Sequence, residues 1–102
     1  MTAYDDENIF AKILRGEIPN TTIYEDDHVL AFDDIAPQAP VHVMVIPKGR
    51  YVSMTDFAEK ASDTEIAALN RAVLKVVDAK GLRVSGYRTM VNSGADGGQE
   101  IP

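Results

Sequence analysis

The sequence predicts a single α+β domain in which one long helix covers a β-sheet. Two short runs rich in β-branched and aromatic residues, 21–25 and 29–33, are separated by a short Asp-rich turn and indicate an antiparallel hairpin. A third apolar run, 41–46, indicates another strand. A capping box that begins at Ser62 then opens a long amphipathic pattern, which is typical of a helix that lies on a sheet.

The length and charge of the chain limit its class and its partners. At 102 residues the chain is long enough for one hydrophobic core, so residues 1–102 are read as one domain. The net charge of −6 argues against nucleic acid as a partner, because affinity for nucleic acid rests on Lys and Arg at the phosphates. A small anionic ligand held by backbone N–H groups stays open.

Three absences from the sequence predict a cytoplasmic protein without a metal. The chain has no Cys, which excludes disulfides and thiolate zinc sites, and we expect no metal and no cofactor. Its acidic N-terminus lacks the pattern of a signal peptide. No apolar stretch approaches the roughly 18–20 residues that span a bilayer, so no membrane contact is expected.

The first element is predicted to be a short amphipathic helix. Asp6 or Glu7 is expected to begin it, and Gly16 to end it. Its apolar face consists of residues at helical spacing, for which packing is favoured over a ligand wall: Ile9, Phe10, Ile13 and Leu14.

The hairpin carries two sets of polar residues. His28 lies in the turn and is expected to be exposed. The pair Asp33-Asp34 directly follows the second strand, where it could cap a turn, bind a divalent metal, or accept two hydrogen bonds from a sugar diol. On spacing alone, turn structure is favoured.

The strand at 41–46 contains one imidazole among apolar residues. Period two places His42 on the same face as Met44 and Ile46. A buried imidazole costs free energy unless its nitrogens are paired. A paired core histidine is the favoured interpretation, and a catalytic or ligand-binding group is the alternative.

The second half of the chain is predicted to contain an irregular connection at 52–60 with at most one helical turn, the long helix, and a further strand. The helix begins at Ser62, ends at Gly81 and has a purely structural role, with a buried stripe of Ile66, Leu69, Val73, Val76 and Val77. Residues 87–92 are read as a strand, and the glycines after them as a plain turn or, less favoured, an anion-binding backbone nest. The loop lacks the Gly-Lys-Ser/Thr ending of a P-loop.

Several segments, taken together, carry a family resemblance. Residues 9–19 read IFAKILRGEIP, residues 32–42 read FDDIAPQAPVH, and VIPK follows at 45–48. Residues 86–94 and Gly97-Gly98-Gln99 complete the set. In this order and spacing they closely resemble the histidine triad (HIT) family, specifically its Hint-like, nucleotide-binding branch.

The resemblance implies an α+β fold with an antiparallel sheet of about five strands, one main covering helix and a short N-terminal helix. It also implies a homodimer that binds a purine nucleoside monophosphate or a nucleotidyl conjugate. By position, Asp34 matches the acid that accepts from the ribose hydroxyls, and His42 matches a histidine that supports the nucleophilic one. The other matches are a base-pocket wall of Ile9, Phe10, Ile13, Ile18, Phe32 and Ile35, and phosphate contacts of Asn92, Gly98 and Gln99.

The family's His-x-His-x-His strand would begin directly after Pro102. We therefore expect that the native protein continues past this residue, and that the 102-residue chain lacks the last strand because it is truncated or has lost its ordered tail. The resemblance then implies an enzyme that cleaves nucleoside phosphoramidates or related conjugates through a nucleotidyl-histidine intermediate. The alternative is a non-catalytic nucleotide-binding or dimeric interaction module, as the 102-residue chain alone would be.

Overall fold

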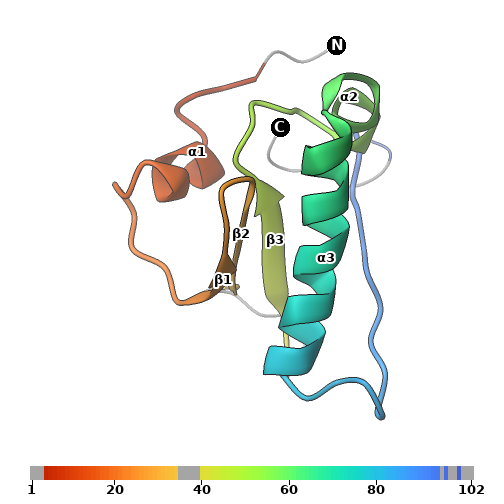
Figure 1. Ribbon diagram of the computed structural model, residues 1–102. Coiled ribbons are helices and arrows are strands. Elements are labelled where there is room, and N and C mark those ends of the chain that lie inside the picture. Colours follow the sequence, from red (N-terminus) through yellow and green to blue (C-terminus); the bar gives the residue numbers. More distant parts are fainter. Residues whose placement is uncertain (1–3, 35–39, 95, 97–98, 100–102) are drawn as a thin grey trace.

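The computed structural model describes residues 4–34, 40–94, 96 and 99, and it confirms the α+β class (Figure 1). A three-stranded antiparallel sheet has the order β1-β2-β3, so β2 is central. The elements of the described chain, in order, are α1 (Ile9–Leu14), β1 (Thr22–Glu25), β2 (Val29–Asp33), β3 (Val43–Pro47), α2 (Met54–Lys60) and α3 (Asp63–Ala79).

The predicted hairpin is confirmed as β1 and β2. One carboxylate oxygen of Asp26 accepts the backbone N–H groups of His28 and Val29, at 2.8 and 2.9 Å, which closes the turn between the strands. His28 is half-buried rather than exposed as predicted. Its carbonyl accepts the N–H of Lys48 at 2.8 Å, so the residue after β3 lies against this turn.

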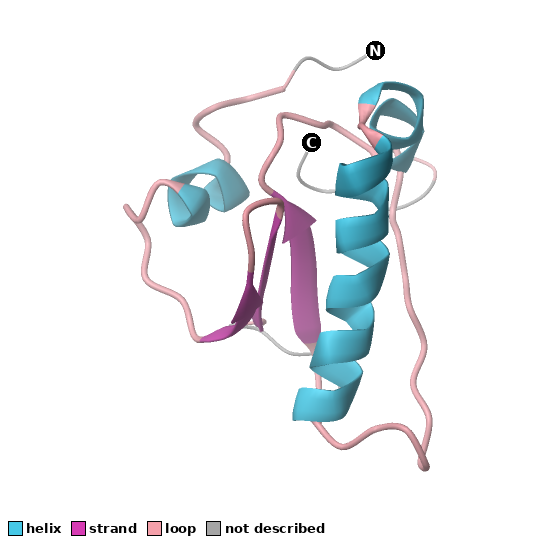
Figure 2. Cartoon of the chain, viewed as in Figure 1, coloured by secondary structure: helices cyan, strands magenta, loops and turns pink. Residues whose placement is uncertain are grey.

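The central strand is buried on both faces because a helix lies on each side of the sheet. Figures 1 and 2 show α1 and α3 on opposite sides. On the α1 side, Leu30 and Phe32 pack with Ile13 and Ile46. Period two turns Val29 and Ala31, both fully buried, to the α3 side. There α3 contacts all three strands, and its own buried residues are Ala72, Val76 and Val77.

The N-cap of helix α1 lies one residue after Glu7 and two after Asp6, the two predicted positions. The N-cap is Asn8, whose side-chain oxygen accepts the N–H of Ala11 at 2.8 Å, and not Asp6 or Glu7. Asn8 is buried, and burying its neutral amide costs less free energy than burying a carboxylate would. Gly16, at φ +79°, follows the helix as predicted.

Helix α3 has the predicted start and end. The Ser62 side chain accepts the N–H of Glu65, and the Glu65 carboxylate accepts the N–H of Ser62, both at 3.1 Å. At the other end Gly81 has φ +68°, and the N–H of Leu82 reaches the Val77 carbonyl at 2.9 Å, which is the bond of a Schellman motif.

The connection predicted at 52–60 contains a true helix, α2, of 7 residues. Ser53 accepts the N–H of Asp56, and the buried Asp56 carboxylate accepts the N–H of Val52 at 2.9 Å. Lys60 lies one turn further on, with its Nζ 2.7 Å from Asp56 Oδ1. This pair of side chains stabilises a helix that the mixed composition of the segment obscured.

We predict that Asp56→Asn lowers the melting temperature at neutral pH. The hydrogen bond from Lys60, and then that from the Val52 N–H, hold the pKa of Asp56 below its usual value. A carboxyl whose pKa is lowered in the folded state stabilises the fold above its unfolded pKa of about 4, and this contribution is lost as pH falls through the lowered value. The wild-type advantage should therefore shrink below about pH 4. Thermal melts of wild type, Asp56→Asn and the exposed control Glu59→Gln over a pH series measure this, and a constant difference would contradict it.

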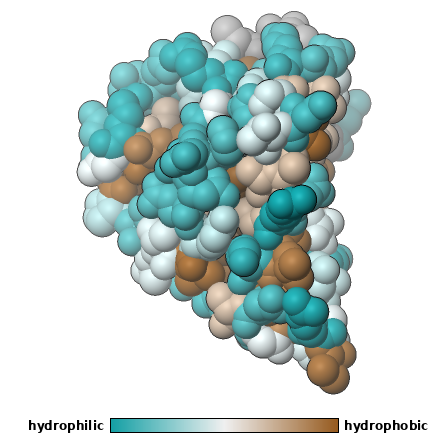
Figure 3. Space-filling model, viewed as in Figure 1, coloured by the Kyte–Doolittle hydropathy of each residue, from teal (hydrophilic) through white to brown (hydrophobic). Residues whose placement is uncertain are grey.

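The prediction of a strand at 87–92 is wrong. In the structure these residues form a loop, and Tyr87, Met90 and Val91 are each more than half exposed. A β-rich run becomes a strand only when a neighbouring strand pairs with it, and no strand within the described residues does so. Figure 3 shows apolar surface at the lower tip of the molecule, where the chain in Figure 1 passes from α3 into this loop. Val84, between α3 and residues 87–92, is fully exposed.

None of the helices that the described residues form has both the length and the apolar character to cross a bilayer.

Candidate functional site

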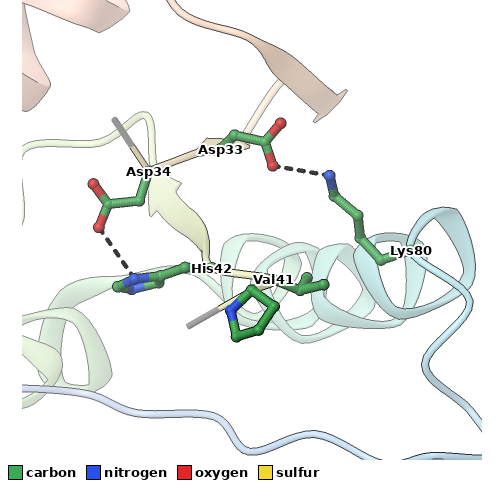
Figure 4. Close-up of a pocket in the computed structure, with 6 residues that line it drawn as sticks. Asp33, Asp34, Val41, His42 and Lys80 are labelled. Carbon is green, nitrogen blue, oxygen red and sulfur yellow. Dashed lines mark ion pairs between the residues drawn. The ribbon is translucent and has the colours of Figure 1, made fainter. Parts of the chain in front are cut away.

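A pocket of about 190 Å³ lies where β2 ends and β3 begins (Figure 4). Its described lining combines two carboxylates, one imidazole, one ammonium group and two apolar residues: Asp33, Asp34, Pro40, Val41, His42 and Lys80.

The strand register brings Asp34 and His42 together. The last pair of the β2–β3 ladder is Asp33 with Val43, and the Asp34 N–H donates to the His42 carbonyl at 3.0 Å, which extends the ladder by one pair. Residues opposite one another in an antiparallel pair place their side chains on the same face. The His42 Nδ1 accordingly lies 3.4 Å from Asp34 Oδ2 (Figure 4).

His42 is therefore a pocket residue and not the core histidine that the strand pattern favoured. β3 begins at Val43, so His42 precedes the strand, and its side chain is 33% exposed. The Asp34 side chain is 22% exposed. Both groups are accessible enough to meet a ligand, and each is held by the backbone of the strand pair rather than by a free loop.

Because successive side chains of a strand point to opposite faces, Asp33 lies on the other side of β2 from Asp34. Its Oδ1 lies 2.9 Å from the Nζ of Lys80, the residue that caps α3 (Figure 4). The sequence interpretation assigned no role to Lys80. A signal was present, because Lys80 lies four residues after Val76 and three after Val77, and so falls on the helix face that is buried against the sheet.

The apolar residues expected to wall a base pocket are brought together by the fold. Ile13 and Phe32 are in the buried cluster, and Ile9, Phe10 and Ile18 pack against it while staying half-buried. The rings of Phe10 and Phe32 are tilted by 56°, with centroids 6.4 Å apart. This cluster lies on the same sheet face as Asp34 and His42, since Phe32 is two residues before Asp34 and Ile46 is four after His42.

The structure does not place the described residues that were expected at a phosphate, Asn92 and Gln99, in the lining of the pocket. Asn92 is exposed in the loop after α3. The Gln99 side chain accepts the Gly94 N–H at 2.7 Å and donates to the carbonyl of Val52, which lies just before α2. Neither is among the described residues of the pocket. Ile35 and Gly98, which were also predicted, lie outside the described residues.

The arrangement is suited to binding an organic ligand with a flat apolar part and a polar part. A half-buried carboxylate can accept two hydrogen bonds from a diol, an imidazole can donate or accept, and aromatic and aliphatic side chains next to them can contact a ring. Within the described ranges, no three His, Asp or Glu side chains converge as metal ligands would.

The fold and the pocket thus define an α+β domain with a histidine and a carboxylate at one end of an antiparallel strand pair. The model of the HIT domain family matches residues 15–102, and the chain belongs to this family.

Relatives of the chain agree with this assignment. A HIT-like protein of Azospirillum brasilense, itself uncharacterised, is 54% identical over 97% of this chain and 81% of its own. The purine nucleoside phosphoramidase of Escherichia coli is 36% identical over 94% of this chain and 80% of its own. The solved structure of a HIT family hydrolase from Legionella pneumophila superposes with a TM-score of 0.79 at 40% identity, and covers 91% of this chain and 82% of that one.

Proposed function

We propose that this protein binds purine nucleotides, and that the native-length protein hydrolyses purine nucleoside phosphoramidates or related nucleotidyl conjugates. The observation that carries the proposal is the Asp34–His42 pair, 3.4 Å apart, on the same sheet face as the cluster around Phe32. The similarity to a purine nucleoside phosphoramidase supports the choice of substrate.

In this proposal each part of a nucleotide meets a different part of the fold. The purine lies on the half-buried apolar side chains of Ile9, Phe10 and Ile18, with Phe32 and Ile13 beneath them. We keep Ile35 as a further proposed base contact on the family resemblance alone. The carboxylate of Asp34 accepts the two ribose hydroxyls. The phosphate is contacted by Asn92, Gly98 and Gln99.

The proposed reaction proceeds through a nucleotidyl-histidine. A histidine nitrogen attacks the α-phosphorus, the P–N bond of the substrate breaks, and the amine leaves with a proton. Water then cleaves the new P–N bond and releases the nucleoside monophosphate. In this proposal His42 supports the reacting histidine and is not itself the nucleophile.

We further propose that the protein works in the cytoplasm as a homodimer, without a cofactor. The alternative function is that of a nucleotide-binding or dimeric interaction module without turnover. Native-length protein incubated with adenosine 5′-phosphoramidate separates the two, because the module would be stabilised by AMP but would release no amine. A faster rate on a dinucleoside polyphosphate would instead point to a polyphosphate hydrolase.

Asp34→Asn tests the binding half of the proposal. We expect the affinity for AMP to fall roughly 10- to 100-fold, because hydrogen bonds to a charged group contribute about 1.5–3 kcal/mol. The loss should be much smaller for a nucleotide that lacks both ribose hydroxyls, since that ligand has nothing to donate to the carboxylate. Isothermal titration measures both affinities.

The matched control is Asp27→Asn, which removes the same charge from an exposed position in the turn before β2. Its affinity for AMP should stay close to that of the wild type. An equal loss for the two ligands in Asp34→Asn would place the ribose elsewhere.

A further inference from the structure

The Asp33–Lys80 ion pair and the Asp34–His42 pair lie on opposite sides of the end of β2, and both line one pocket (Figure 4). The Lys80 and Asp33 side chains are only 27% and 37% exposed, so their charges are less screened than those of surface groups. Asp33 and Asp34 are consecutive residues, and without Lys80 the described lining of the pocket would contain two carboxylates and no Lys or Arg.

This charge balance matters because the proposed ligand is an anion. The whole chain has a net charge of −6, which repels a nucleotide at long range. Lys80 is the single Lys or Arg among the described residues that line the pocket. Its 2.9 Å contact with Asp33 offsets the charge of the carboxylate that is not assigned to the ribose.

On the basis of the proposed nucleotide site, we infer that Lys80 is a charge-masking residue. It neutralises Asp33 so that an acidic protein can hold an anionic nucleotide whose ribose is bound by Asp34. Lys80 and Asp33 act on the ligand through the electrostatic potential of the pocket and do not contact the reacting atoms. The role differs from that of a mechanical link between α3 and β2, and the two roles predict different results for Asp33→Asn.

Charge masking predicts different effects on AMP binding for the two partners of the pair. Lys80→Met exposes the Asp33 charge and should weaken AMP binding about three- to tenfold, as expected for unit charges several ångströms apart at a half-exposed site. Asp33→Asn removes that charge and leaves Lys80 positive, so AMP binding should stay the same or become tighter. The double variant should return close to the wild-type affinity. A mechanical link predicts that all three variants bind more weakly.

Two ligands and two salt concentrations sharpen the distinction. Adenosine carries no phosphate charge, so its affinity should be the same in wild type and Lys80→Met, whereas a displaced Asp34 would weaken adenosine and AMP alike. In 1 M NaCl, where the Debye length is about 3 Å, the AMP difference should largely disappear. Lys80→Arg, which keeps the charge, should bind AMP as the wild type does.

The experiment uses native-length protein, titration calorimetry with AMP and adenosine, and thermal melts of each variant. Lys75→Met is the matched control, because it removes one positive charge from an exposed position of the same helix that does not line the pocket.

If Lys80→Met does not fold, Asp33→Asn alone decides, since weaker AMP binding in that variant overturns the inference. Equal losses for AMP and adenosine in Lys80→Met overturn it as well. A wild type that binds neither ligand would instead refute the proposed function, and the inference with it.

Discussion

Replacing His42 by alanine is expected to lower the turnover of a nucleoside phosphoramidate about 10- to 100-fold, because a catalytic histidine that loses its supporting partner departs from its reactive geometry. The affinity for AMP should change less than about fivefold. The contact of His42 with Asp34 is long, at 3.4 Å, and partly exposed, and ion pairs of this kind contribute only about 0–1 kcal/mol. The split between a large effect on kcat and a small one on binding is the signature of a supporting residue.

Steady-state kinetics and AMP titration on native-length protein measure the two quantities. His28→Ala is the control, since His28 is the other histidine of the chain, lies in the turn before β2 and does not line the pocket. It should leave kcat unchanged. Unchanged turnover in His42→Ala would mean that the imidazole only fills space, and a parallel loss of AMP affinity would make it a binding residue.

The elements that sequence analysis predicted well are those fixed by neighbouring residues. The hairpin needs only two β-rich runs and an Asp whose side chain closes the turn, and α3 needs only Ser62, Glu65 and Gly81 around an apolar stripe. In each element the deciding hydrogen bonds span five residues or fewer, so a local pattern contains the necessary information.

The two errors in secondary structure have different causes. α2 was predicted as no more than one helical turn, although its signal is local. Ser53 and Asp56 repeat the spacing of a capping box, but the mixed composition of the segment hid this pattern. Residues 87–92 have the composition of a strand, but a strand is defined by its partner, and composition does not show whether a partner is present. Whether these residues form a strand therefore depends on residues far away in the sequence.

The candidate site was predictable to the extent that it follows from strand period. His42 and Ile46 share a face in any strand, and a resemblance to a known family singled out Asp34. The sequence did not show that Asp34 pairs with His42, because that contact depends on the β2–β3 register across a loop. The contact between Asp33 and Lys80 joins a strand to the end of a helix far along the chain, so only the folded structure shows it.

Phe32→Ala is expected to have the largest effect on stability. Phe32 is 4% exposed on the central strand and packs in the cluster with Ile13, Leu30 and Ile46. Removing a buried aromatic ring of this kind costs about 3–5 kcal/mol, because the transfer free energy is lost and a cavity is left. That is a large part of the roughly 5–15 kcal/mol by which a domain is stable, so the variant should unfold at a much lower denaturant concentration.

Urea unfolding at constant temperature measures the loss as a shift of the midpoint with an unchanged slope. Val84→Ala provides the control, because Val84 is fully exposed and its truncation should change stability by no more than about 0.5 kcal/mol. Phe32→Leu keeps an apolar side chain and should fold, yet it removes the ring from the proposed base wall, so AMP should bind it more weakly. If Phe32→Leu binds AMP as the wild type does, the purine does not lie on this cluster, and Phe32 serves the core alone.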